Sequence, residues 1–123
     1  MRSIEDNIVV GKSKSFALRC IRMYQVLVKE RSEYVLSKQL LRSGTSIGAN
    51  VKEALRGQSK ADFAAKLSIA LKEASESEYW IELLGESEII TKQEFESIHH
   101  DCRELIKILT SIVKTTFMSI HNS

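Results

Sequence analysis

The sequence contains no proline and only five glycines among its 123 residues. Strand-rich folds need frequent turns, and turns draw heavily on these two residue types, so their scarcity favours a few long helices. A chain of this length corresponds to one domain and can bury a substantial core. We therefore expect an all-α protein with a single domain over residues 1–123.

The sequence also lacks any apolar run near the roughly 20 residues that cross a bilayer. Its beginning, MRSIEDNIVV, carries Glu5 and Asp6 and has neither the apolar core nor the cleavage site of a signal peptide. These absences predict a cytoplasmic protein that has no membrane partner. Cys20 and Cys102 fall on apolar helix faces, so we predict reduced core thiols, with a disulfide as the alternative.

Apolar residues recur at steps of three and four in four long segments, the spacing of one helix face. The predicted helices span about residues 13–31, 33–56, 60–88 and 92–118, after a lead-in over residues 1–11 and before a frayed tail from about residue 119. Four helices with short connections pack most simply as an antiparallel up-down-up-down four-helix bundle.

Capping signals mark the predicted helix starts. Ser59 with Asp62, and Thr91 with Glu94, have the spacing of a capping box and predict the beginnings of the third and fourth helices. Ser32 is the predicted cap of the second helix. The predicted inner face of the first helix follows Ala17, Cys20, Tyr24, Leu27 and Arg31, and the stripe is widened by Phe16, Ile21, Met23 and Val28.

The second predicted helix contains LLRSGTSIGANVKEALRG, residues 40–57, whose inner face is unusually small. Glycine costs about 1 kcal/mol relative to alanine inside a helix, but the apolar period continues through Gly44 and Gly48 without a change of phase. Counting back from the turn before the third helix places these glycines level with Ala74 and Ala70. We therefore predict that the second and third helices cross closely there.

Charge is unevenly distributed along the chain. Residues 1–72 hold 14 basic and 6 acidic residues, whereas residues 73–123 hold 4 basic and 10 acidic residues. In an up-down bundle this pattern predicts one acidic end and one basic end, which would attract RNA or DNA phosphates through counterion release. The alternative is an ordinary mixed, solvated surface. The residues expected toward the basic end are Lys12, Lys14, Lys52, Arg56, Lys60, Lys66, Lys107 and Lys114.

Polar residues on the predicted second and third helices are candidates for a binding site. Asn50 and Glu53 lie one turn apart, and Glu76 and Glu78 lie on the third helix. They suit a ligand or a partner, but helix-surface carboxylates more often form ion pairs between helices, for instance with Arg42 or Lys72. The candidate binding residues are Arg42, Asn50, Glu53, Arg56, Lys60, Glu76 and Glu78.

Catalytic and metal-binding patterns are weak. His99, His100 and Cys102 suggest metal ligands, because His99 and Cys102 are three residues apart and could share a helix face. However, Cys102 falls in the apolar seam, and no second Cys or His cluster in the sequence completes a tetrahedral site. The glycines of SGTSIG sit inside a helix pattern and not in a phosphate loop, and no nucleophile elbow is present. We expect no enzymatic activity, no cofactor and no metal.

Aromatic residues flank the seam of the third helix. Tyr79, Trp80 and Leu83 either widen the core or cover a subunit interface, where aromatic side chains are favoured. Both alternatives remain open from the sequence.

Three segments carry a resemblance to a known family: YVLSKQLLRSGTSIGANVKEA, SKADFAAKLSIALKEASESEYWIELL and LTSIVKT. From about Ile8 to Thr116 the chain resembles the bacterial four-helix-bundle proteins encoded by intervening sequences in large-subunit ribosomal RNA genes. Many members carry Pro where this chain has Gly48, and one branch reads TSIGAN as here. The matching motif positions are Arg42, Ser46, Asn50, Glu53, Ser59, Glu76 and Glu78.

The resemblance implies a homo-oligomer, in known members a ring of five, and supplies no catalytic role. A distant relative is the accessory protein of diversity-generating retroelements, a basic pentamer that binds nucleic acid and a reverse transcriptase. We expect a binding or scaffolding accessory protein that associates with RNA or DNA. The alternative is a protein-interaction ring without a nucleic-acid role.

Overall fold

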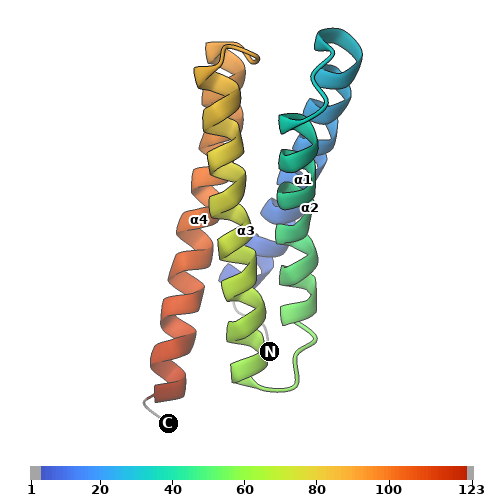
Figure 1. Cartoon of the computed structure of the whole chain (residues 1–123). Helices are drawn as coiled ribbons and strands as arrows, with labels where there is room; N and C mark the ends of the chain where they lie inside the picture. Colours follow the sequence, from blue (N-terminus) through green and yellow to red (C-terminus); the bar gives the residue numbers. More distant parts are fainter. Residues whose placement is uncertain (1–3, 122–123) are drawn as a thin grey trace.

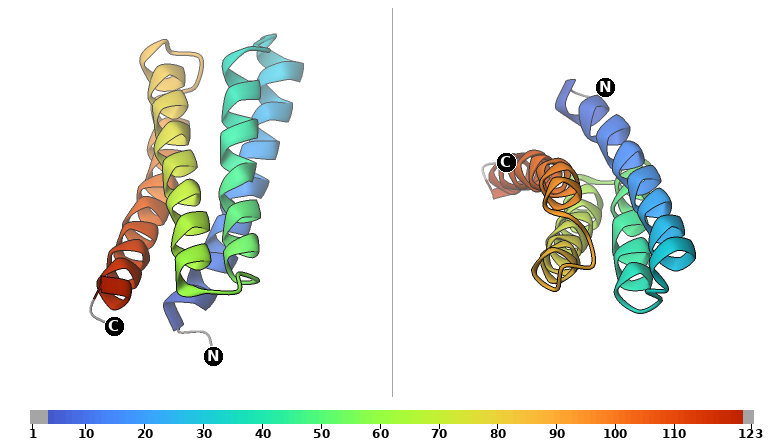
Figure 2. Two further views of the ribbon diagram at one scale, coloured as in Figure 1. Left: turned by 60° about the horizontal axis from the view of Figure 1, so that its bottom comes forward. Right: turned by 90° about the horizontal axis from the view of Figure 1, so that it is seen from above.

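The structure, a computed structural model, describes residues 4–121 and contains four helices (Figure 1). They are α1 (Ile4–Arg31), α2 (Leu36–Ala54), α3 (Lys60–Glu86) and α4 (Lys92–His121). Successive helices run in opposite directions and pack on one another, and α1 also packs on α4. The predicted antiparallel up-down-up-down bundle is therefore confirmed. Figure 2 shows that α1 is inclined to the other three helices.

Helix α1 begins at Ile4, so the predicted lead-in is wrong for residues 4–11, while residues 1–3 lie outside the described part. Glu5 and Asp6 occupy the first turn, where negative charge interacts favourably with the helix dipole. Val9 is buried and continues the core seam by one more turn. Burial of the Val9 side chain therefore stabilises a helical conformation in this segment, which the sequence pattern alone did not predict.

The inner face of α1 agrees with the predicted one only in part, since Cys20 and Leu27 are buried but its other predicted positions are not. Ala17 and Tyr24 are only half-buried and Arg31 is exposed. The buried positions on α1 are Val9, Ser13, Phe16, Cys20 and Leu27. Phe16, which was predicted only to widen the stripe, is buried in place of Ala17, and Val9 and Ser13 extend the buried face toward the start of the helix. A wide apolar stripe left the choice open, and contact with α2 and α4 decides it.

The Glu33 side chain caps the start of α2, so the prediction that Ser32 caps this helix is wrong. Ser32 adopts φ of 52°, and α2 begins at Leu36. The Glu33 carboxylate accepts hydrogen bonds from the backbone N–H groups of Val35, Leu36 and Ser37 at 2.7–3.0 Å. Partial burial acts to raise the pKa of Glu33, but these three donors lower it below its ordinary value.

The caps predicted for α3 and α4 are confirmed. The Ser59 hydroxyl accepts a hydrogen bond from the Asp62 N–H at 3.1 Å. Thr91 and Glu94 form a reciprocal capping box, with distances of 2.8 Å and 3.1 Å. Helix α3 ends two residues earlier than predicted, and α4 continues to His121, so residues 119–121 are helical and not frayed. Residues 122–123 lie outside the described part.

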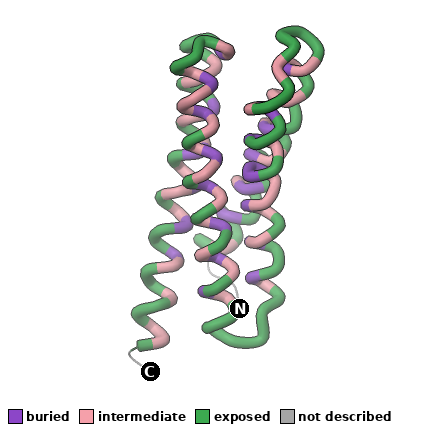
Figure 3. The backbone as a smooth tube through the Cα atoms, viewed as in Figure 1, coloured by how far each residue is buried: buried purple, intermediate pink, exposed green. Residues whose placement is uncertain are grey.

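The core is one cluster of apolar side chains along the inward sides of the helices (Figure 3). The three- and four-residue spacing predicts inner seams that run from Leu36 to Ala54 on α2, from Phe63 to Leu84 on α3 and from Phe95 to Thr116 on α4. These seams are confirmed except at their ends, where Leu36, Phe63, Phe95 and Thr116 are only partly buried. The confirmed positions are Leu40, Gly44, Ile47, Val51 and Ala54 on α2, Leu67, Ala70, Ala74, Ser77, Ile81 and Leu84 on α3, and Ile98, Cys102, Leu105, Leu109 and Ile112 on α4. Ser43 and Ser77 are fully buried and bond to each other at 2.8 Å between α2 and α3. Each hydroxyl is therefore satisfied without water.

Gly44 and Gly48 face α1, so their predicted contact with α3 is wrong. A Cβ atom at Gly44 would overlap the Cys20 sulfur, and one at Gly48 would lie 3.5 Å from the Ser13 hydroxyl. The surface of α2 toward α3 carries Ser43 instead. Counting from the turn located these residues along the helix, but it contained no information on the rotation of α2 about its axis.

Both cysteines are buried and free, as predicted. Burial raises the pKa of Cys20 far above its ordinary value and raises the pKa of Cys102 to about 12. The Cys102 thiol donates to the Ala74 carbonyl at 3.3 Å. Both thiols therefore stay protonated at neutral pH and act as core residues. Within residues 4–121, no helix combines the length and apolarity needed to cross a membrane.

Candidate functional site

Arg42, Glu73 and Glu76 form an ion-pair cluster between α2 and α3. Arg42 lies 3.3 Å from Glu73 and also contacts the Glu76 carboxylate. Glu76 in turn accepts a hydrogen bond from the Trp80 indole at 3.4 Å. Two of the predicted site residues are thus brought together, but each is engaged with a neighbour in the bundle. Their arrangement matches the alternative of ion pairing between helices.

Asn50 and Glu53 do not converge on a shared site. The Asn50 amide donates to the Ser46 carbonyl of its own helix at 2.9 Å. Glu53 is exposed and lies 4.0 Å from the Lys66 ammonium. Exposed pairs of this kind contribute little to stability. Thr45 and Ser46 likewise return hydroxyl hydrogen bonds to carbonyls one turn earlier, both at 2.7 Å.

Glu78 faces α4. Its carboxylate lies 3.0 Å from Nε2 of His99 and 3.4 Å from the Arg103 guanidinium. His99 and Cys102, which the sequence suggested as partners, have different neighbours. His99 contacts Glu78, whereas the Cys102 thiol donates to the Ala74 carbonyl.

The aromatic pair on α3 lies at the edge of the core. Tyr79 is 52% exposed, whereas Trp80 packs against the core cluster. Their ring centroids are 5.2 Å apart in an edge-on arrangement. Trp80 therefore widens the core, while Tyr79 remains available on the outer surface of this chain.

A groove between α1 and α2 gathers positive charge. It has a volume of about 460 Å³, with Gly48 and Val51 in its apolar lining. Lys14, Lys52 and Arg56 line it, all three are exposed, and no acidic residue is part of the lining. Among the salt bridges found within residues 4–121, none involves these three cations. The groove is therefore a concave surface that presents three cations without a fixed counter-ion.

The groove lies at the end of the bundle that holds the α2–α3 loop (Figure 1). Residues 4–17, 45–72 and 107–121 make up this end and hold nine basic and four acidic residues. The other described residues hold eight basic and twelve acidic residues. Lys60 belongs to the basic end and donates to the Ser119 hydroxyl at 2.8 Å. The bundle is thus electrically dipolar along its axis.

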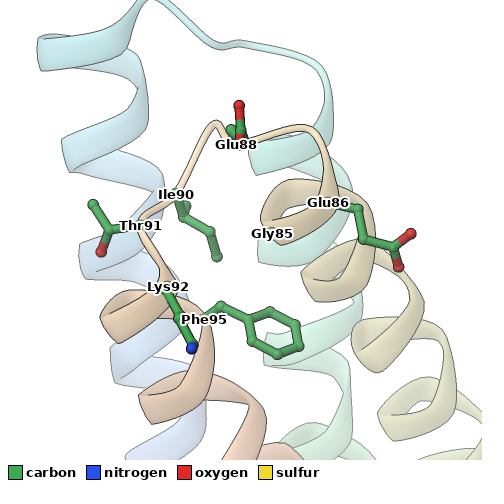
Figure 4. A pocket seen from close by; sticks show the side chains of 7 residues that line it. All are labelled: Gly85, Glu86, Glu88, Ile90, Thr91, Lys92 and Phe95. Carbon is green, nitrogen blue, oxygen red and sulfur yellow. The ribbon is translucent and has the colours of Figure 1, made fainter.

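A second cavity, of about 430 Å³, opens at the α3–α4 turn (Figure 4). Phe95 lies against Gly85, where a Cβ atom would come within 2.6 Å of the ring. Figure 4 shows the carboxylates of Glu86 and Glu88 pointing outward, away from Phe95. Because its polar groups do not converge, this cavity makes a weaker candidate than the basic groove.

Comparison with known proteins places this geometry in a family. The family model described as 23S rRNA-intervening sequence protein matches residues 5–111. The chain belongs to the 23S rRNA-intervening sequence protein family. A crystal structure of a protein of unknown function from the S23 ribosomal protein family of Bacteroides thetaiotaomicron is similar to it, with 56% identity and a TM-score of 0.89. That match covers 90% of this chain and 99% of the other.

None of the curated proteins matches the chain. Membership of the intervening-sequence protein family therefore establishes the bundle and its ancestry, and it brings no biochemical role, since the similar crystal structure is itself described as of unknown function. A functional interpretation of this family member has to come from its own surface.

Sequence reasoning identified the basic residues of this intervening-sequence protein but not the groove. Arg56 was a candidate because of charge, whereas the apolar lining and the approach of Lys14 from α1 depend on how α1 packs on α2. Glu82, which lies beside Glu78 and His99, was missed as well. Its spacing of four residues from Glu78 was the one available signal.

Proposed function

We propose that this protein is a non-enzymatic, oligomeric binding protein that associates with nucleic acid through its basic end. The observation that supports this proposal is the groove lined by Lys14, Lys52 and Arg56, with no acidic residue in its lining. Cations without a fixed counter-ion retain their full attraction for phosphate. The charge of a paired cation such as Arg42 is instead largely neutralised by the carboxylates that it contacts within the bundle.

Oligomerisation would multiply this attraction. In a ring of parallel subunits the basic ends of all subunits would form one face. Phosphate contacts release condensed counterions, and each additional contact steepens the dependence of affinity on salt. A ring would therefore bind a nucleic-acid strand far more tightly than a single bundle does, because the contacts act together.

The decisive experiment measures RNA and DNA binding by fluorescence anisotropy over a series of salt concentrations. We expect wild-type protein to bind at low salt and to lose affinity linearly in log–log coordinates. The double variant Arg56→Glu and Lys60→Glu should bind much more weakly, and its salt slope should be smaller by about 1 for each phosphate contact removed.

The matched control is Lys38→Glu, which makes one such charge reversal at the opposite end of the bundle, on the exposed surface of α2. We expect this control to retain most of the binding. Absence of measurable binding by the wild-type protein at low salt would contradict the proposal, as would equal losses in the control and in single Arg56→Glu or Lys60→Glu variants.

A protein-interaction ring is the alternative function. The observation in its favour is the exposed apolar surface of α1, where Ile8, Val10, Leu18 and Ile21 are each 37–44% exposed. Native mass spectrometry of the protein purified from its host separates the two alternatives. A ring that carries RNA supports the first proposal, and a ring that carries a stoichiometric protein partner without nucleic acid supports the second.

A further inference from the structure

Three side chains with metal-binding atoms meet between α3 and α4. They are Glu78, Glu82 and His99, and one donor atom from each lies within 4.8 Å of the other two. We propose that these three residues bind a divalent first-row transition metal, with Zn²⁺ as the reference ion. This inference does not depend on the proposed function, because the cluster lies on a different pair of helices from the basic groove.

The arrangement is held in place by the fold. Glu78 and Glu82 are one turn apart on α3, so their carboxylates share one face of that helix. His99 approaches from α4 with its Nε2 atom 3.0 Å from Glu78. The Phe95 ring stacks on the His99 imidazole, with centroids 4.9 Å apart and an interplanar angle of 15°. This stacking restricts the imidazole, which lowers the cost of ordering a ligand.

The charges of Glu78 and Glu82 also favour a bound cation. Two carboxylates one helical turn apart repel each other, and all three side chains are partly buried, so water screens the repulsion incompletely. Arg103 lies 3.4 Å from Glu78 and offsets part of it. Within residues 4–121, no hydrogen bond or ion pair of the Glu82 carboxylate is found. A divalent cation would relieve the repulsion and give Glu82 a partner.

The donor set determines the class of metal. Two carboxylate oxygens and one imidazole nitrogen suit Zn²⁺ and its first-row neighbours, and the absence of a thiolate disfavours soft ions such as Cu⁺. In a tetrahedral zinc site the donors are roughly 3.4 Å apart, given metal–ligand distances of about 2.0–2.2 Å. The Glu78–His99 distance of 3.0 Å is already close to that value. Binding of one ion would draw the Glu82 oxygen, which lies within 4.8 Å of the other two donor atoms, toward this spacing.

The test is Zn²⁺ binding to the metal-stripped full chain, measured by isothermal titration calorimetry and by the Zn²⁺-dependent rise in Tm. We expect one ion per chain. His99→Gln and Glu82→Gln should each weaken binding by at least roughly tenfold, the scale that removing even an outer-shell group of a zinc site produces. His100→Gln is the matched control, because His100 is the exposed neighbour of His99 on the same helix.

Two further readouts separate a metal site from a simple ion-pair cluster. Arg103→Gln should strengthen Zn²⁺ binding, since it removes a competing cation from Glu78, and Co²⁺ substitution should give the visible absorption of a four-coordinate oxygen and nitrogen site. The proposal is overturned if the wild-type protein binds no Zn²⁺ up to submillimolar free ion. It is also overturned if His99→Gln and Glu82→Gln bind as the wild type does, with circular dichroism showing that all variants are folded.

Discussion

Replacing Gly44 with leucine is expected to destabilise the bundle by roughly 1–3 kcal/mol or more, as in other overpacked cores. The Gly44 Cα lies against the Cys20 side chain of α1, and even a single added Cβ would overlap the Cys20 sulfur and come within 3.1 Å of its Cβ. Both residues are fully buried, so neither side chain can turn outward. Thermal unfolding followed by circular dichroism should show Tm lowered by several degrees per kcal/mol.

Two control variants separate overpacking from helix propensity. Gly11→Ala adds the same first atom where nothing lies within 4 Å, so it should stabilise α1 by up to about 1 kcal/mol. Gly44→Ala should be harmful in the wild type and less harmful in a Cys20→Ala background, where the overlapping sulfur is absent. Retention of wild-type Tm by Gly44→Leu would contradict the close approach of α1 and α2 described above.

Replacing Glu94 with glutamine is expected to lower stability by about 1–2 kcal/mol at neutral pH, the effect of losing a charged cap. Glu94 connects two parts of the acidic end. Its carboxylate accepts hydrogen bonds from two guanidinium nitrogens of Arg31 at 2.8–2.9 Å and from the Thr91 N–H at 2.8 Å. Glutamine retains one acceptor oxygen for the cap, but it cannot form the two-pronged ion pair with Arg31.

The pH dependence of this effect follows from the pKa of Glu94. Hydrogen bonding to Arg31 and then to the Thr91 N–H lowers that pKa from 4.5 to about 2. A lowered native pKa means that the unfolded state binds a proton first as pH falls. The contribution of Glu94 is therefore complete above the unfolded value near pH 4.5 and disappears as the pH approaches 2. The difference in Tm between wild type and Glu94→Gln should shrink over that range.

Glu96→Gln is the matched control, since Glu96 is exposed on the same turn of α4 and forms no ion pair found among the described residues. We expect its Tm to follow the wild type at every pH. If the difference between wild type and Glu94→Gln stayed constant from pH 6 to the acid limit of folding, the lowered pKa of Glu94 would be wrong.

Local signals in the sequence predicted most of the secondary structure correctly. The Ser59 and Thr91 caps and the seams of α3 and α4 depend on residues within one or two turns of each other, so their spacing carries the information. The start of α1 was missed because Val9 has no local partner that marks it as a helix residue. Its burial in the core is a tertiary effect.

The candidate site was predictable only in part. The cations at positions 14, 52 and 56 and the carboxylates at 78 and 82 are visible in the sequence, and up-down connectivity places them at opposite ends. Neither the groove nor the Glu78–Glu82–His99 cluster was predicted. Both join residues from different helices, and such a pairing depends on how each helix is rotated about its axis.

The sequence by itself determined the four helices, their antiparallel order and the dipolar distribution of charge, because periodicity, caps and short connections are local properties. Only the tertiary structure decided which neighbour each face meets. Gly44 illustrates the difference, since counting from the turn estimated its level along α2, yet it faces Cys20 of α1 and not α3. A helix in a bundle has two neighbours, and packing of the whole core selects between them.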